Sequence, residues 1–166
     1  DPEPVVWPAD PPAQDAGRPS AEVDPAEAEA TDEILAVLDG FRRVELEAYA
    51  DPQPPHVARR DLSPYLADPL LSRTLGTLDT MLQTGVVYEG RHRWQPDVVD
   101  LQLDATPPTA TIHDCLDRTQ WRPVFRETGD PVPSDLPDRY LMRLDAKLFP
   151  DGWLLHGAAI EKETPC

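Results

Sequence analysis

The spacing of apolar residues changes once along this chain of 166 residues, at Gly85. Before this glycine, apolar residues recur every three or four positions, which predicts amphipathic helices. After it, they alternate with polar residues, which predicts half-buried strands. Helices followed by a run of antiparallel strands are typical of an α+β domain whose helices pack on one face of a sheet. No internal repeat is visible, so we expect a single such domain.

The three segments predicted to be helical cover residues 31–50, 56–61 and 68–84. The first ends before Asp51-Pro52, because proline cannot continue a helix. In the third, Asp68 is predicted to be the N-cap and Pro69 the first helical residue. Gly85 suits the left-handed position that commonly follows a helix.

The segments predicted to be strands cover residues 86–94, 99–103, 109–116, 140–148 and 153–161. A further short segment, 121–125, is expected to continue the third strand around a bend. Residues 149–152 have the sequence Phe-Pro-Asp-Gly, in which proline presets a turn and glycine accepts the left-handed conformation. The last two strands are therefore predicted to form a hairpin.

The N-terminal part of the chain differs in composition from the rest. Residues 1–33 contain seven prolines, ten acids and one base, and hence −9 of the net charge of −16. Such a segment cannot bury enough apolar surface to offset the entropy of ordering. We therefore expect residues 1–30 to be a disordered tether and residues 31–166 to be the folded domain. Trp7 is the one residue of this tether that could dock on a partner.

Composition also excludes several classes of protein. With 31 acids against 15 bases, the chain lacks the cationic surface of a nucleic-acid-binding protein. No apolar run reaches the roughly 20 residues of a membrane-spanning helix. The four histidines and two cysteines show no metal-ligand spacing, so neither a metal nor another cofactor is predicted. The absence of a signal peptide fits a cytosolic chain, and equally a chain from which an export signal or lipid-anchor segment was removed.

One succession of residues carries a family resemblance. The segment Pro107-Pro108-Thr109-Ala110-Thr111-Ile112-His113-Asp114-Cys115-Leu116-Asp117 is followed by Trp121, by Glu127-Thr128-Gly129-Asp130 and by a terminal Cys166. With the helix–strand order, it resembles the NTF2-like superfamily, which includes SnoaL-like and ketosteroid-isomerase-like proteins, and within it secreted or lipid-anchored proteins of actinobacteria. The resemblance covers about residues 31–166. It implies a cone in which a curved, mostly antiparallel sheet wraps around N-terminal helices.

The resemblance also implies a disulfide. In an NTF2-like sheet the strand that holds Cys115 and the segment after the last strand can lie side by side, so Cys115 and Cys166 are predicted to be bonded. Closing a loop of this length stabilises a fold by roughly 4 kcal/mol in the chain-entropy model. A disulfide indicates an oxidising compartment, outside the cell or in its envelope. Two free thiols in a cytosolic protein remain the alternative.

Candidate site residues follow from the same segment. His113 and Cys115 face the same side of a strand, as a Cys–His nucleophile requires, but the disulfide would consume the thiol. Asp114 shares a face with Ala110, Ile112 and Leu116, and the resemblance implies that a carboxylate in the cone can act as a general base. Alternatively, Asp114 caps a turn or pairs with Arg118 or Arg122. The pocket-lining candidates are Tyr49, Tyr88, Trp94, His113, Asp114 and His156.

Three functional hypotheses follow. The first is a non-catalytic extracytoplasmic domain on a flexible tether that binds a protein partner or a small apolar ligand, as envelope assembly modules do. The second is a small enzyme or ligand carrier of the isomerase or cyclase type with Asp114 as base. The third is an acidic inhibitor or immunity-type protein that binds a basic partner. A homodimer through the outer face of the sheet is compatible with each of them, and a lipid anchor before Asp1 stays open.

Overall fold

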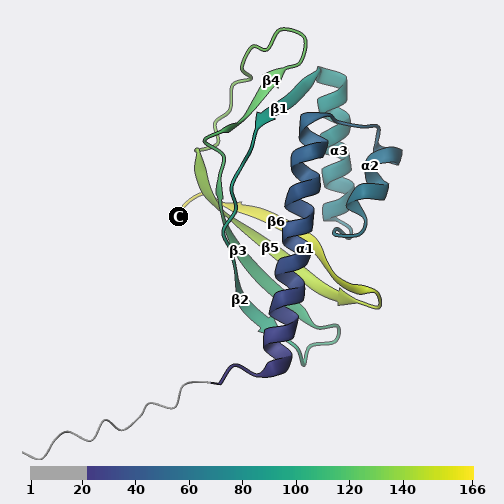
Figure 1. Ribbon diagram of the computed structural model, residues 1–166, viewed down its shortest axis with the longest axis vertical. Coiled ribbons are helices and arrows are strands. Elements are labelled where there is room, and N and C mark those ends of the chain that lie inside the picture. Colours follow the sequence, from purple (N-terminus) through teal and green to yellow (C-terminus); the bar gives the residue numbers. More distant parts are fainter. Residues whose placement is uncertain (1–21) are drawn as a thin grey trace, which may run out of the picture.

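The computed structural model describes residues 22–166, so the expected tether, including Trp7, lies largely outside the described residues. Three helices come first: α1 (Pro25–Ala50), α2 (Pro55–Leu62) and α3 (Leu70–Thr84). Six strands follow: β1 (Val86–Gly90), β2 (Pro96–Gln102), β3 (Thr109–Asp117), β4 (Trp121–Phe125), β5 (Arg139–Phe149) and β6 (Gly152–Glu161). Figure 1 shows this order, with the helices beside the strands. The predicted α+β class is confirmed.

Helix α1 begins earlier than predicted, at Pro25 instead of residue 31, so residues 25–30 are not part of a disordered segment. The side chain of Asp24 caps the helix by accepting a hydrogen bond of 2.9 Å from the Ala26 amide. Pro25 suits the first turn, and the Ala and Glu residues that follow are strong helix formers. Acidic composition was the wrong criterion here, because Glu next to Ala favours a helix as much as it favours disorder.

Helix α3 starts at Leu70, two residues after the predicted N-cap. Asp68 still satisfies the helix start, because its carboxylate accepts a hydrogen bond of 3.0 Å from the Ser72 amide. Gly85 has φ of 69°, the left-handed conformation predicted for it. The boundary between the helical and the alternating part of the sequence is therefore a real structural boundary.

The strands form two antiparallel sheets, one in the order β2-β3-β5-β6 and a separate pair β1-β4. The expectation that residues 121–125 continue the third strand is wrong: β4 turns back and pairs with β1, with Trp121 opposite Gly90. The first strand also ends at Gly90, not at residue 94. Gly90 has φ of 80°, and a Cβ there would collide with the carbonyl oxygen of Gln120. This close approach requires glycine and ends the strand.

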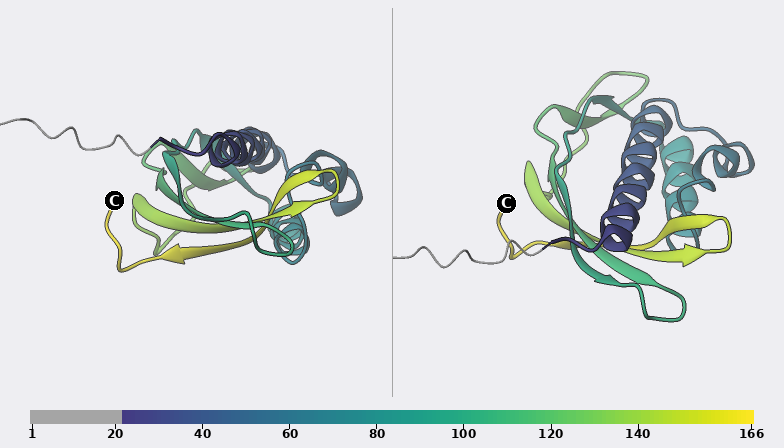
Figure 2. Two further views of the ribbon diagram at one scale, coloured as in Figure 1. Left: turned by 90° about the horizontal axis from the view of Figure 1, so that it is seen from below. Right: turned by 60° about the horizontal axis from the view of Figure 1, so that its bottom comes forward.

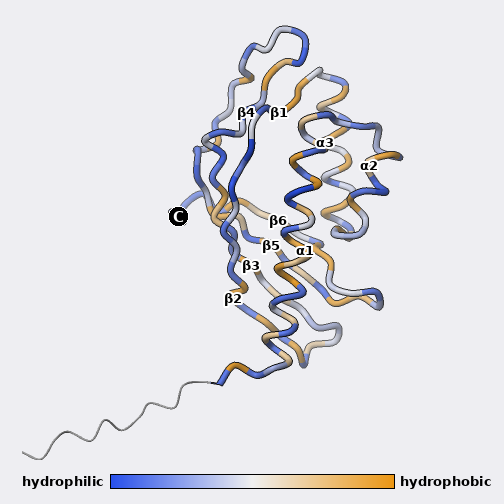
Figure 3. The backbone as a smooth tube through the Cα atoms, in the orientation of Figure 1, coloured by the Kyte–Doolittle hydropathy of each residue, from blue (hydrophilic) through white to orange (hydrophobic). Residues whose placement is uncertain are grey.

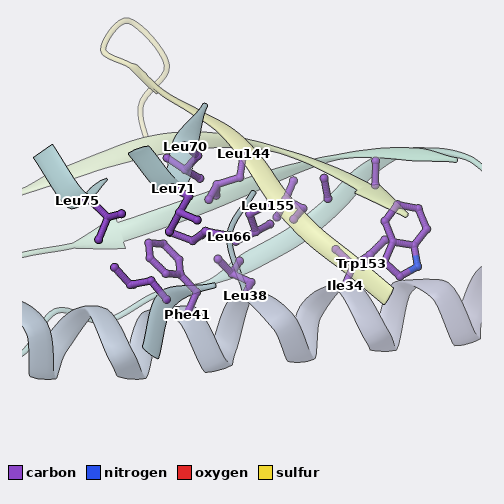
Figure 4. Packing of buried hydrophobic residues seen from close by; sticks show 14 of the residues in the cluster. Ile34, Leu38, Phe41, Leu66, Leu70, Leu71, Leu75, Leu144, Trp153 and Leu155 are labelled. Carbon is purple, nitrogen blue, oxygen red and sulfur yellow. The ribbon is translucent and has the colours of Figure 1, made fainter. Parts of the chain in front are cut away.

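The main sheet is curved and not closed into a barrel, and α1 lies across its hollow (Figure 2). Along β3, buried and half-buried positions alternate, so that Ile112 and Leu116 face the helices. In Figure 3, α1 alternates between hydrophobic and hydrophilic colours, as a helix with one buried face does. Leu38 and Phe41 project from this face into the core (Figure 4). Each fully buried side chain of this size contributes roughly 1.5–3 kcal/mol.

Cys115 and Cys166 form a disulfide, with their Cα atoms 5.7 Å apart. The bond connects β3 to the last residue of the chain, as predicted. Both cysteines of the sequence are used, so no free thiol remains. Among the helices of residues 22–166, none has the length and apolar composition needed to cross a membrane.

Candidate functional site

The most concentrated group of buried polar side chains lies where the second half of α1 meets β3. The stripe of α1 that faces the sheet is apolar at Ile34, Leu38 and Phe41 and then becomes charged at Arg42 and Glu45. On β3, the inward-facing position between Ile112 and Leu116 is occupied by Asp114. This stripe of α1 and this face of β3 meet, and so bring one base and two acids into the interior.

Arg42 and Asp114 form a fully buried ion pair, with 1% and 0% of their side-chain surfaces exposed. Arg42 donates from Nε and Nη2 to Asp114 Oδ2 at 3.0 and 2.7 Å. The other oxygen, Oδ1, accepts a hydrogen bond of 2.9 Å from the Gln95 amide. Both carboxylate oxygens are therefore occupied by protein donors. The alternative in which Asp114 is ion-paired is the one observed, although the partner is Arg42 and neither Arg118 nor Arg122.

Glu45 and His92 extend this pair into a four-residue network. Glu45 Oε2 accepts from Arg42 Nη1 at 2.8 Å and contacts His92 Nε2 at 3.0 Å. Burial alone would raise the pKa of Glu45, but Arg42 and His92 together hold this pKa below its ordinary value. Burial would likewise lower the pKa of Arg42, yet Glu45 and Asp114 raise it instead. Arg42 and Glu45 are thus both held in their charged forms.

An aromatic cluster lies against one end of the network. The Trp121 ring is 5.3 Å from Tyr49, 4.3 Å from Tyr88 and 4.5 Å from His92, measured between ring centroids. Burial raises the pKa of Tyr49 well above its ordinary value, and Glu45 adds to this effect. The phenol of Tyr49 therefore stays protonated at neutral pH and cannot serve as a base.

The structure brings together only some of the predicted pocket-lining residues. Tyr49 and Tyr88 meet in the aromatic cluster, next to the Asp114 network, and Trp94 touches His92 edge-on at 5.4 Å. His113 lies on the half-buried face of β3, opposite to Asp114. His156 lies on β6 at an irregularity in the pairing with β5, and burial lowers its pKa.

These six residues therefore do not line one cavity. Sequence reasoning missed Arg42, Glu45 and Trp121 as parts of the site. Arg42 left a signal: it follows Leu38 by four positions on the apolar stripe, where a charged residue indicates a buried partner.

The side chains of Arg42 and Asp114 are buried, and Asp114 lines none of five surface hollows of residues 22–166. In the same part of the chain, no group of three or more His, Cys, Asp or Glu side chains is arranged to hold a metal ion. Three protein donors occupy the two carboxylate oxygens of Asp114, and the side chain is fully buried. The arrangement joins α1 to the sheet.

Two hollows on the surface are relevant to binding. The first, which we call the α1–α2 groove, has a volume of about 650 Å³ and carries Glu47, Asp51, Asp61 and Arg60 among its lining residues. Asp51 is paired with Arg126 at 2.8 Å, so the charge of this rim is partly neutralised. The second, the α3–β4 hollow, has a volume of about 340 Å³.

A second buried arginine lies beside the α3–β4 hollow. Arg118 follows the end of β3 and is 2% exposed. Within residues 22–166, its side chain makes one hydrogen bond, from Nη1 to Ser134 Oγ at 3.3 Å, and its Nε has no partner. The sequence analysis proposes Arg118 only as a possible partner of Asp114, and in the structure that partner is Arg42.

Comparison with known proteins shows likeness in fold alone. No protein-family model and no curated protein sequence matches the chain. Among solved structures, the Kfla4162 protein from Kribbella flavida is similar with a TM-score of 0.51 and 17% identity, over 82% of this chain and 93% of that one. The intermembrane space region of chloroplast protein ARC6 has a TM-score of 0.49 and 14% identity, over 78% of this chain and 95% of that one.

Proposed function

We propose that this chain is a non-catalytic binding or assembly domain of the NTF2-like type that works outside the cytoplasm. The observation that carries the proposal is the state of Asp114. The resemblance implies that the enzymes of this superfamily use a carboxylate inside the cone as a base, and Asp114 occupies an inward position of that kind. Here Arg42 and the Gln95 amide use both of its oxygens, and the carboxylate is fully buried.

The hollow of the sheet is also filled, which supports the same proposal. Ile34, Leu38 and Phe41 of α1 pack against β3, β5 and β6. Trp121 and the two tyrosines close the end next to the network. A filled cone can bind through its surfaces, whereas an isomerase or cyclase needs an enclosed cavity that reaches its base.

The compartment is argued from the disulfide. Cys115 and Cys166 are 51 positions apart, and closing a loop of that length contributes roughly 4 kcal/mol in the chain-entropy model. Cytosolic reductants keep such thiols reduced, so a structural disulfide favours an oxidising compartment.

Catalysis is tested with a proton-transfer probe. 3-Cyclohexen-1-one rearranges to the conjugated 2-cyclohexen-1-one when a base removes the proton next to its carbonyl, and the conjugated product is followed by its ultraviolet absorbance. We expect the wild-type protein to be no faster than buffer. Turnover by the wild-type protein that Asp114→Asn abolishes in a folded variant would contradict the proposal and support the enzyme alternative.

The compartment is tested by trapping thiols in intact cells of the native host. Rapid acid quenching, followed by alkylation and intact-mass measurement, should leave Cys115 and Cys166 unmodified unless reductant is added first. The Cys115→Ala/Cys166→Ala variant provides the unmodified reference mass. Alkylation of both cysteines without reductant, on protein recovered from the cytoplasmic fraction, would overturn the extracytoplasmic assignment.

A further inference from the structure

Arg118 is a buried cation without a buried anion. Its side chain is 2% exposed, yet among residues 22–166 it makes no ion pair and only the long hydrogen bond to Ser134. The loop that covers it is rich in acids, since residues 126–138 contain Glu127, Asp130, Asp135 and Asp138. Within residues 22–166, none of their carboxylates accepts from the Arg118 side chain. Asp138 accepts from the Arg118 amide with its backbone carbonyl at 2.7 Å, whereas its carboxylate pairs with the exposed Arg122 at 2.8 Å.

This arrangement is energetically unfavourable for the protein alone. A buried charge normally has a partner, because taking it out of water costs several kcal/mol that only an opposite charge or several hydrogen bonds can offset. The guanidinium has five N–H donors, and one of them is used here. An anion supplied from outside the chain would provide the missing acceptors.

The α3–β4 hollow gives such an anion a route. Ser134 lines the hollow, and its hydroxyl is 3.3 Å from Arg118 Nη1. The Ser134 side chain therefore lies between the hollow and the guanidinium. Ser134 itself is exposed. Tyr88 also lines the hollow, and the charge of Arg118 acts on its phenol. Burial raises the pKa of Tyr88, and Arg118 is the largest opposing influence. A displacement of Ser134 would open Arg118 to the hollow.

The other lining residues of the α3–β4 hollow indicate which class of ligand would fit. Half of the lining residues are apolar, namely Met81, Val86, Pro123, Val132 and Pro133, and the others are uncharged residues with hydroxyl groups. The hydroxyls of Thr77, Thr80 and Thr84 donate to carbonyls of their own helix, α3, at 3.1, 3.0 and 2.7 Å. These three hydroxyls therefore offer no free donors to a polyanion. Among the described residues that line the hollow there is no Lys or Arg, so Arg118, in contact with Ser134, is the cation that a ligand displacing Ser134 would reach. An apolar body with a single negative charge fits this lining.

We propose that the α3–β4 hollow binds a small apolar monocarboxylate whose carboxylate replaces the Ser134 hydroxyl as the partner of Arg118. Guanidinium and carboxylate form two parallel charge-assisted hydrogen bonds, a stronger arrangement than a bond to a hydroxyl. The volume of about 340 Å³ is at the lower end of the range for ligand pockets, which sets the size class. This assignment goes beyond the proposed function and does not depend on the compartment.

The test needs no variant in its first step. 3-Phenylpropanoate and its neutral analogue 3-phenylpropanamide are titrated into the full chain at neutral pH, with amide NMR shifts as the readout. We expect saturable shifts around Tyr88, Met81 and Ser134 with the acid, and at least tenfold weaker binding of the amide. Equal binding of acid and amide, or no saturable shift with the acid, would overturn the proposal.

Variants then assign the contact. Arg118→Met should weaken binding of 3-phenylpropanoate at least tenfold, while Ser134→Ala should leave it unchanged or tighter because the competing hydroxyl is gone. Arg122→Met is the matched control: it removes a nearby arginine that is exposed and already paired. Wild-type affinity in Arg118→Met, or an equal loss in Arg122→Met, would show that Arg118 does not hold the carboxylate.

Discussion

Arg42 and Arg118 are both removed from water, with 1% and 2% of their surfaces exposed, but their surroundings are opposite. Arg42 donates three hydrogen bonds to two carboxylates at 2.7 to 3.0 Å. Arg118 donates one, to a hydroxyl at 3.3 Å. Burial alone therefore does not show that an arginine is structural. The partners of its guanidinium decide: Arg42 is in an ion pair that joins a helix to a strand, whereas Arg118 lacks an anionic partner within residues 22–166.

The origin of the partners explains the difference. Glu45 is on the same helix as Arg42, one turn further on, and Asp114 comes from the middle of a strand. Both are held by regular structure. Arg118 follows the end of β3 and is covered by a loop, so nothing regular presents an acid to it. Charged contacts that hold a fold together are built on helices and strands, whereas loops leave room for a ligand.

Removing the partner of Arg42 should produce the largest effect. Asp114→Leu replaces the buried carboxylate on β3 by an apolar side chain and leaves the Arg42 guanidinium with Glu45 alone. Breaking a buried pair in this way costs roughly 3–5 kcal/mol, because a buried charge loses its compensation. Urea unfolding followed by tryptophan fluorescence measures the change.

The control for this variant removes the stranded charge as well. Arg42→Met combined with Asp114→Leu replaces the pair by apolar side chains, and such replacements are often neutral. Glu45 then keeps only its contact with His92, so the double variant is compared with the two single variants. Its loss of stability should be smaller than the sum of the losses in Asp114→Leu and Arg42→Met. Additive losses would mean that Asp114 and Arg42 stabilise the fold independently, and the ion pair would not be the connection between α1 and β3.

An effect of intermediate size is expected from Glu45 as the pH falls. Burial opposes ionisation, but Arg42 and His92 hold the pKa of Glu45 below its ordinary value of 4.5. Its folded-state pKa is thus depressed, so its stabilising contribution is complete above about pH 4.5 and is lost as the pH falls through the folded-state value. Glu45→Gln should remove this part of the slope in the urea midpoint between pH 6 and pH 3.

The comparison of the two arginines provides the reference for this measurement. Arg118→Met should keep the acid slope of the wild-type protein, because no carboxylate within residues 22–166 pairs with Arg118. An unchanged slope in Glu45→Gln, or a flattened one in Arg118→Met, would assign the acid sensitivity to other groups. Carboxylates outside the network, such as the exposed Asp68 and the half-buried Asp117, cancel in the difference between variant and wild type.

The fold could be predicted from the sequence where local periodicity decides. The change at Gly85, the alternation along β3 and the final hairpin are local patterns, and each corresponds to an observed element. The pairing of β4 with β1 could not be predicted, since it joins residues more than thirty positions apart through a close approach at Gly90. Local patterns show which residues are half-buried, but they do not choose the neighbouring strand.

In the candidate site, too, the features set by local pattern could be predicted and the long-range partners could not. Alternation placed Asp114 on the inward face of β3, and the family resemblance paired Cys115 with Cys166; both are observed. The partner of Asp114 could not be predicted, because Arg42 is 72 positions away and on a helix. The nearby Arg118 and Arg122 were the local choice. Proximity in sequence misled there, since β3 ends before both of them and presents Asp114 to Arg42 of α1.

The smallest effect on stability is expected for Arg118→Met, and it separates the two arginines most clearly. Methionine keeps most of the apolar stem and removes a buried charge that has one long hydrogen bond to offset its desolvation. The Ser134 hydroxyl loses the Arg118 donor in this variant, but Ser134 is exposed, so a water molecule can donate to the hydroxyl instead.

We therefore expect a change of no more than about 1 kcal/mol, in either direction, in the free energy of unfolding without ligand. Arg42→Met should cost several times more, because it leaves Asp114 and Glu45 buried without their cation. Equal losses in the two methionine variants would mean that Arg118 contributes to the fold as Arg42 does. A small loss for Arg118→Met, together with weaker binding of 3-phenylpropanoate, would instead show that its burial serves the ligand.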